Sequence, residues 1–103
     1  MSKKLIEAGN TKEIKLGKMK RIEIGNKAIL ICNVNDQFYA VDDMCTHEDS
    51  SLYLGCIKGD LVQCSLHGAK FSVITGEPKE EPAEVPLQTY PIVIKGETIF
   101  VEI

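Results

Sequence analysis

The sequence lacks the features that would place a protein in a membrane, on nucleic acid or outside the cell. Its longest purely apolar run is Ala28 to Cys32, which is far too short to cross a bilayer. A basic pair stands near the start, but no apolar stretch follows it, so no secretory signal is predicted. Twelve basic and fifteen acidic residues give a net charge of −3, which predicts no attraction to nucleic acid or to anionic membranes. We therefore expect a protein of the cytoplasm, where thiols stay reduced.

Helical patterns and a nucleotide-binding motif are also missing. No stretch keeps helical periodicity over three turns. The eight glycines are scattered singly, so no G-x-G-x-x-G motif for a dinucleotide is present. A chain of 103 residues is long enough for one small domain with one core and too short for two. One domain spanning residues 1–103 is therefore predicted.

What the sequence does contain is a series of short strands separated by turn signals. Residues 19–24 alternate between apolar and charged, and residues 28–34 form an apolar, β-branched run that suits a strand buried on both faces. The predicted strands are 19–24, 28–34, 37–41, 61–63, 70–74, 90–95 and 98–103. The first three are expected to form a meander, and the last two a closing hairpin. An all-β fold with antiparallel strands is predicted.

Two further segments favour turns and loops. A single turn capped by Asn10 or Thr11 is expected over residues 10–14. The proline-rich, acidic segment from Glu77 to Pro86 is typical of a solvated loop, with an acidic docking surface as the alternative.

Histidine is scarce, and both histidines lie close to a cysteine. One pair is Cys45-x-His47, and the second is Cys64-x-x-His67. Both pairs fall in a loop-rich region between two blocks of predicted strands, which is where a rigid scaffold commonly carries a binding site. Thiolate and imidazole are ligands of soft or borderline metals, so these four residues are candidate metal ligands.

Three kinds of site remain open from the residue types alone. Zinc sites usually pair two cysteines and then two histidines, whereas here each loop supplies one of each. Two loops that clamp a two-iron cluster from opposite sides need this mixed order, with cysteines on one iron and histidines on the other. Disulfides are the third possibility, but they belong to oxidising compartments.

The two motifs resemble the signature of a known family. Cys45-Thr46-His47, sixteen intervening residues and then Cys64-Ser65-Leu66-His67-Gly68 are similar to the Rieske [2Fe–2S] pattern. The surrounding "DQFYAVDDMCTH", "GDLVQCSLHGAKFSVITGE" and "YPIVIKGETIFVEI" resemble the soluble Rieske-type ferredoxins of bacterial aromatic-ring-hydroxylating oxygenase systems. The resemblance implies one [2Fe–2S] cluster per chain. Its implied ligands are Cys45, His47, Cys64 and His67.

The resemblance also implies a fold. The expected architecture is the all-β Rieske fold, an antiparallel β-sandwich-like base with a loop-rich cluster-binding subdomain inserted at about residues 42–76. Gly68 directly follows a predicted ligand and lacks a Cβ, so it suits close approach of the backbone to the cluster.

Departures from one branch of the family predict a low redox potential. The high-potential branch carries an extra cysteine pair at positions that match Ser50 and Leu66. It also carries a serine and a tyrosine at positions that match Ala69 and Phe71. Without these hydroxyl donors the reduced cluster is less stabilised, which lowers the potential. The acidic residues Glu48 and Asp49, which follow His47, act in the same direction.

The resemblance implies an electron carrier and not an enzyme, and no catalytic residue is predicted. Both histidines are committed to the cluster, so none remains for the mononuclear iron of an oxygenase. The expected donor is an NAD(P)H-dependent flavin reductase, and the expected acceptor is a terminal oxygenase. A monomer is expected. Two alternatives remain open, namely the small subunit of an assimilatory nitrite reductase and a zinc-binding structural or interaction module.

The remaining cysteines and the surface carry weaker expectations. Cys32 lies in an apolar strand and is expected to be a small buried hydrophobe, and Cys56 is expected to be structural. Thr46 and Leu66 are expected to form an apolar rim near the cluster that binds partners. Leu52 and Tyr53 are expected either to extend this rim or simply to pack around the cluster. An acidic ring for basic partners, or a merely solvated face, is expected from Asp42, Asp43, Glu48, Asp49, Glu80, Glu81 and Glu84.

Overall fold

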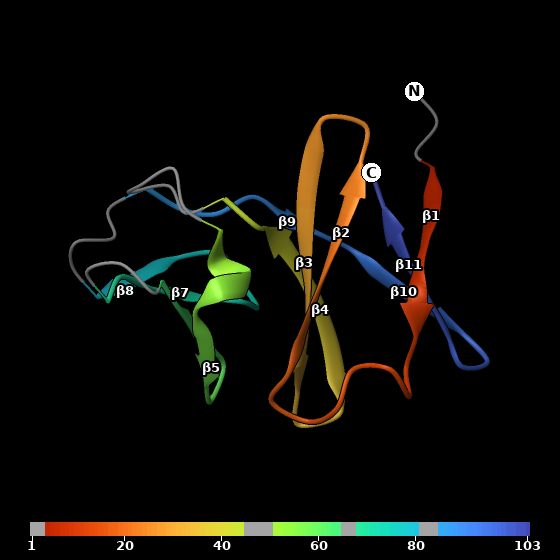
Figure 1. The fold of residues 1–103 in the computed structure, drawn as a ribbon, viewed down its shortest axis with the longest axis horizontal. Coiled ribbons are helices and arrows are strands. Elements are labelled where there is room, and N and C mark those ends of the chain that lie inside the picture. Colours follow the sequence, from red (N-terminus) through yellow and green to blue (C-terminus); the bar gives the residue numbers. More distant parts are fainter. Residues whose placement is uncertain (1–3, 45–50, 65–67, 81–84) are drawn as a thin grey trace.

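The computed structural model describes residues 4–44, 51–64, 68–80 and 85–103 (Figure 1). These residues are built almost entirely from short strands and turns. The elements are β1 (Leu5–Asn10), β2 (Met19–Ile24), β3 (Lys27–Val34), β4 (Gln37–Asp42), η1 (Leu52–Leu54), β5 (Cys56–Lys58), β6 (Leu61–Gln63), β7 (Lys70–Ser72), β8 (Pro78–Glu80), β9 (Thr89–Tyr90), β10 (Ile92–Lys95) and β11 (Thr98–Glu102). Within the described ranges the only helical element is the 3₁₀ turn η1, and no helix there is long and apolar enough to span a membrane. The predicted all-β class is confirmed.

The strands form three antiparallel sheets. One has the order β1-β11-β10, a second β2-β3-β4-β9, and a third β5-β6-β7-β8. Figure 1 shows the second sheet between the other two. The third sheet comes from the chain between β4 and β9, which is the region that carries both Cys/His motifs. The assignment of residues 1–103 to one domain, with an inserted part at about 42–76, stays a prediction.

The central strand β3 separates two hydrophobic cores. Leu30 and Cys32 on one face belong to a core that also contains Leu52, Cys64 and Phe71 from the third sheet and its flanking loops. The other face faces the sheet of β1, β10 and β11, where a second core forms around Ile29, Ile31, Ile99 and Val101. Burial on both faces explains why residues 28–34 are a continuous apolar run rather than an alternating one.

Tight turns define the meander and the closing hairpin, as predicted. Asn35 and Asp36 both have positive φ angles, 53° and 64°, which is the conformation of the two-residue hairpin turn between β3 and β4. The predicted turn after β1 is also present, because the side-chain oxygen of Asn10 accepts a hydrogen bond from the Lys12 amide at 2.8 Å. Glu13 completes it by accepting from the Asn10 amide at 2.7 Å.

The predicted single strand 90–95 was wrong, because the chain is divided at Pro91 into β9 and β10, which belong to different sheets. Three further strands were not predicted from the sequence. They are β1, β5 and β8, and β8 lies within the acidic segment that was expected to be a loop. β8 pairs with β7 at the edge of its sheet and begins at Pro78, where a missing amide hydrogen is tolerated.

Candidate metal centre

The first motif lies between two points that the fold holds together. Met44 and Ser51 form an isolated antiparallel bridge, so the chain leaves and returns at one place around residues 45–50. The Leu52 amide donates to the Asp43 carbonyl oxygen at 2.6 Å, which fixes the start of η1 against the end of β4. The predicted ligands Cys45 and His47 themselves lie outside the described residues.

The second motif is closed in a similar way at the end of the β6–β7 hairpin. The Cys64 amide donates to the Ala69 carbonyl oxygen at 2.7 Å, which holds the residues on the two sides of the motif together. Gly68 has a φ of 70°, which is the left-handed region that favours glycine. Cys64 is 1 % exposed and belongs to the core, whereas His67 is outside the described part of the chain.

The flanks of the two motifs touch each other through glycine. A Cβ on Gly55, which follows η1, would lie 1.8 Å from the carbonyl oxygen of Gln63, the residue before Cys64. Only glycine permits this approach, because the atoms that a Cβ would meet belong to the main chain of Gln63 and Leu52 and cannot rotate away. The fold therefore brings the segment after the first motif directly against the strand that leads into the second.

The surroundings of Cys64 fit an iron–sulfur cluster with few hydroxyl donors. Ala69 and Phe71 are both fully buried in the same core as Cys64, and neither has a hydroxyl group. Gln63 Oε1 is buried and has no hydrogen-bond partner among the described residues. Three of the four predicted ligands lie outside those residues, and the described part alone holds no group of three or more His, Cys, Asp or Glu side chains that could bind a metal.

The other two described cysteines differ sharply in environment. Cys32 is fully buried, as predicted, and its burial, assisted by the negative charge of Asp43, raises the pKa of its thiol to about 12. Cys56 is an exposed free thiol on β5, so any structural role it has is not one of core packing.

The structure decides between the two expectations for Leu52 and overturns one surface prediction. Leu52 is fully buried and packs in the core, which is the packing alternative and not an exposed rim. Asp43 is 2 % exposed, so it cannot contribute to an acidic ring. The neighbouring Asp42 is half-buried and accepts a hydrogen bond from the Tyr90 hydroxyl at 2.6 Å. Of the remaining members of the predicted rim and ring, only Tyr53 has a described side chain, and it is 47 % exposed.

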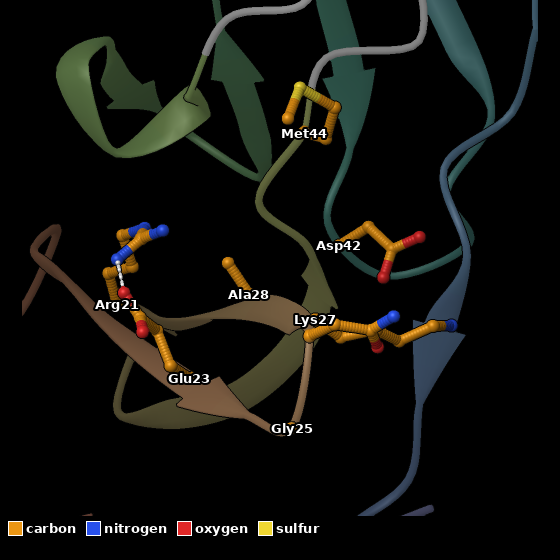
Figure 2. A pocket seen from close by; sticks show the side chains of 8 residues that line it. Arg21, Glu23, Gly25, Lys27, Ala28, Asp42 and Met44 are labelled. Carbon is orange, nitrogen blue, oxygen red and sulfur yellow. Dashed lines mark hydrogen bonds and ion pairs between the residues drawn. The ribbon is translucent and has the colours of Figure 1, made fainter.

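Exposed apolar residues beside the first motif were missed from the sequence. Met44, which forms the bridge with Ser51, is 52 % exposed, and Leu54, which lies with Tyr53 in η1 just after Ser51, is 70 % exposed. We call these three residues the apolar flank. Met44 also borders a groove of about 370 Å³ along the β2–β3 hairpin, and Figure 2 shows Arg21 and Asp42 on different sides of this groove.

Comparison with protein families matches residues 4–91 to the Rieske [2Fe-2S] domain. The chain belongs to the Rieske [2Fe-2S] family. Its cofactor is a Rieske-type [2Fe–2S] cluster.

Several relatives of this Rieske protein are ferredoxin components of dioxygenase systems. It is 44% identical over 87 residues to the ferredoxin component of biphenyl 2,3-dioxygenase from Rhodococcus jostii (strain RHA1), covering 84% of this chain and 81% of the relative. It is 37% identical to ferredoxin CarAc from Metapseudomonas resinovorans, over 82% of this chain and 80% of that one. Ferredoxin components of this kind are electron carriers and not catalytic enzymes. The relatives do not favour the nitrite reductase subunit, and the [2Fe-2S] family does not favour the zinc module.

Solved structures agree with the sequence relatives. A chain in the complex of reduced oxygenase and oxidized ferredoxin in carbazole 1,9a-dioxygenase superposes on this Rieske protein with a TM-score of 0.91 and 33% identity, covering 94% of this chain and 91% of that chain. The Sphingomonas yanoikuyae B1 ferredoxin superposes with a TM-score of 0.91 and 25% identity, over 96% and 98% of the two chains.

Proposed function

We propose that this Rieske ferredoxin takes one electron from an NAD(P)H-dependent flavin reductase and passes it to the terminal oxygenase of an aromatic-ring-hydroxylating system. The observation that carries this proposal is the close match to a chain in a ferredoxin–oxygenase complex. The names of the relatives, which include ferredoxin components of two biphenyl dioxygenases, support the same acceptor class. The protein acts as a monomer in the cytoplasm.

The cluster is held by Cys45, His47, Cys64 and His67. This ligand set is supported by the mixed Cys/His order of the two motifs and by the buried position of Cys64. It is also supported by the contact of Gly55 with the backbone of Gln63, which joins the flanks of both motifs. When bound, the cluster supplies a one-electron redox change.

The cluster operates at low potential. The side chains at positions 69 and 71 are alanine and phenylalanine, and both are buried in the core that contains Cys64. Neither can donate a hydrogen bond to a sulfur, so the more negative reduced state gains no stabilisation from them.

Both partners dock at the apolar flank. Met44, Tyr53 and Leu54 are large apolar side chains that remain exposed on the described surface immediately beside the first motif. Burying such a patch against a partner is favourable, and a small contact area suits the transient complexes of electron carriers.

A pair of cysteine variants tests the ligand set and the function together. Cys64→Ser removes a proposed ligand from the core, whereas Cys56→Ser changes an exposed thiol on the neighbouring strand β5 and serves as the matched control. We expect Cys56→Ser to retain two irons per chain and the EPR signal of a reduced [2Fe–2S] cluster, and Cys64→Ser to lose both.

The functional readout is electron transfer to an oxygenase. The chemically reduced wild-type protein and Cys56→Ser should each reduce the oxygenase component of biphenyl dioxygenase in a stopped-flow experiment, and Cys64→Ser should not. Full cluster content in Cys64→Ser would contradict the ligand set. Failure of the reduced wild-type protein to transfer electrons would contradict the acceptor class.

A further inference from the structure

Asp43 is a buried carboxylate at the junction between the base and the first motif. Its side chain is 3% exposed, although the residue directly follows β4 in a polar stretch of sequence. Burial of a carboxylate is costly unless hydrogen bonds and an opposite charge compensate for the water that is lost. The contacts of Asp43 therefore need an explanation.

Three groups from different parts of the chain donate to this carboxylate. Arg21 Nε on β2 donates to Oδ2 at 3.0 Å, and the Ser51 hydroxyl donates to the same oxygen at 2.5 Å. The Tyr53 amide donates to Oδ1 at 2.9 Å. The carboxylate thus joins the β2-β3-β4-β9 sheet, which we call the base sheet, to Ser51 and Tyr53, which follow the first motif.

The main chain of Asp43 is held on both sides as well. Its amide donates to the Ala28 carbonyl oxygen on β3 at 3.0 Å, and its carbonyl oxygen accepts from the Leu52 amide at 2.6 Å. Asp43 therefore sits at a fixed place on the base sheet while its side chain holds the chain where it returns from the first motif. An apolar side chain could fill this position, but it could not fix Ser51 and Tyr53 to Arg21.

We propose that Asp43 is a positioning residue that holds the two ends of the first motif at the separation needed to present Cys45 and His47 to the cluster. This inference rests on the proposed ligand set. Arg21 fixes Asp43 to the base, and Ser51 transmits its position to the returning chain. Because the hydrogen bonds are charge-assisted and the accepting carboxylate is buried, they hold this geometry more firmly than neutral bonds would.

Ser51→Ala is the mildest test. It removes one hydroxyl and leaves the Arg21–Asp43 pair and the core in place. A hydrogen bond to a charged group is strong enough that its loss should speed cluster release into a chelator by about tenfold to hundredfold. The EPR signal of the remaining reduced cluster should shift or broaden, because the ligands would occupy several positions. Ser51→Thr keeps a hydroxyl and should restore both properties.

A pair of isosteric variants compares two adjacent carboxylates. Asp43→Asn replaces one acceptor oxygen with an NH₂ group, which is a donor. In either orientation this donor meets another donor, the Tyr53 amide on one side or Arg21 and Ser51 on the other, so at least one hydrogen bond is lost. Asp42→Asn makes the same change at a side chain that binds the Tyr90 hydroxyl instead. We expect Asp43→Asn to change the EPR signal and the rate of cluster release. Asp42→Asn should leave the EPR signal unchanged and the release rate within about twofold of wild type.

The Arg21 side chain offers a further control. Its other partner is the exposed Glu23, at 2.8 Å (Figure 2), so Glu23→Gln removes a surface ion pair without touching Asp43. Glu23→Gln should leave the cluster signal unchanged.

The outcomes separate a positioning role from simple stabilisation. If Ser51→Ala and Asp43→Asn lower only the melting temperature, with wild-type EPR spectra and release rates, the proposal is overturned. Should Asp43→Asn fail to fold, Ser51→Ala and its threonine partner still decide. Retention of the cluster by Cys64→Ser would instead contradict the proposed ligand set, and this result is distinct from any of those for Ser51.

Discussion

Replacing Gly55 with alanine should separate the flanks of the two motifs and empty the metal centre. An ideal Cβ at this position lies 1.8 Å from the Gln63 carbonyl oxygen and 2.9 Å from its carbonyl carbon, although real Cβ atoms essentially never come within 3.0 Å of a neighbour. Both clashing atoms belong to the main chain of β6, which pairs with β5, so no side chain can rotate to make room. The backbones themselves must move apart.

The size of the effect follows from these contacts. Overpacking costs about 1–3 kcal/mol, and each main-chain hydrogen bond lost between β5 and β6 adds about 1 kcal/mol. We expect the free energy of unfolding to fall by about 3–5 kcal/mol. In a domain of this size, that corresponds to a melting temperature at least about 12 °C lower.

Gly59→Ala is the matched control for Gly55→Ala. Gly59 lies in the turn between β5 and β6 with a φ of 64°, and a Cβ there meets nothing within 4 Å. Its replacement costs only the strain of a left-handed alanine, about 1–2 kcal/mol. Thermal unfolding and iron content per chain would be measured for both variants. The reasoning fails if Gly55→Ala binds a full complement of iron and unfolds within a few degrees of Gly59→Ala.

Two further predictions concern acidity and redox potential. The thiol of Cys32 has a pKa raised by burial from 9.0 to about 12, so the unfolded chain loses this proton first as the pH rises. The free energy of unfolding should therefore fall between about pH 9 and pH 12, by up to about 4 kcal/mol. Urea titrations of the wild type and Cys32→Ala should show a shallower fall in the variant; equal slopes would contradict the assigned pKa. In protein-film voltammetry, the wild type should have a midpoint near the low end of the Rieske range, about −150 mV. Phe71→Tyr, which adds the hydroxyl found in high-potential relatives, should raise this midpoint. A wild-type value well above about 0 mV would contradict the low-potential assignment.

Local patterns predicted the part of the fold that local interactions determine. Residues 28–34 predicted a buried strand because both faces of β3 meet a core. Asn35 and Asp36 predicted a turn because both residue types tolerate positive φ angles. The meander and the closing hairpin join neighbouring segments, so their pairing was readable from the sequence.

Features that depend on distant partners were not predictable in this way. β1 pairs with β11, at the other end of the chain, and a bulge between Glu7 and Gly9 interrupts its alternation. Asp43 was assigned to the surface because it is charged, but its partner Arg21 lies 22 residues away on β2. For Leu52 the sequence left a surface rim and interior packing open, and the packing of the third sheet against the second decides for burial.

The two-sided burial of β3 has a consequence for how this fold can diverge. Alternate residues of one strand belong to separate cores, Leu30 and Cys32 on the side of the metal centre and Ile29 and Ile31 on the side of the base. A change of side-chain volume at Ile31 can be compensated by residues of the core that contains Ile99 and Val101. A change at Cys32 can be compensated by residues of the core that contains Cys64. Selection can therefore adjust the environment of the cofactor while the supporting scaffold drifts independently, even though a single strand carries both.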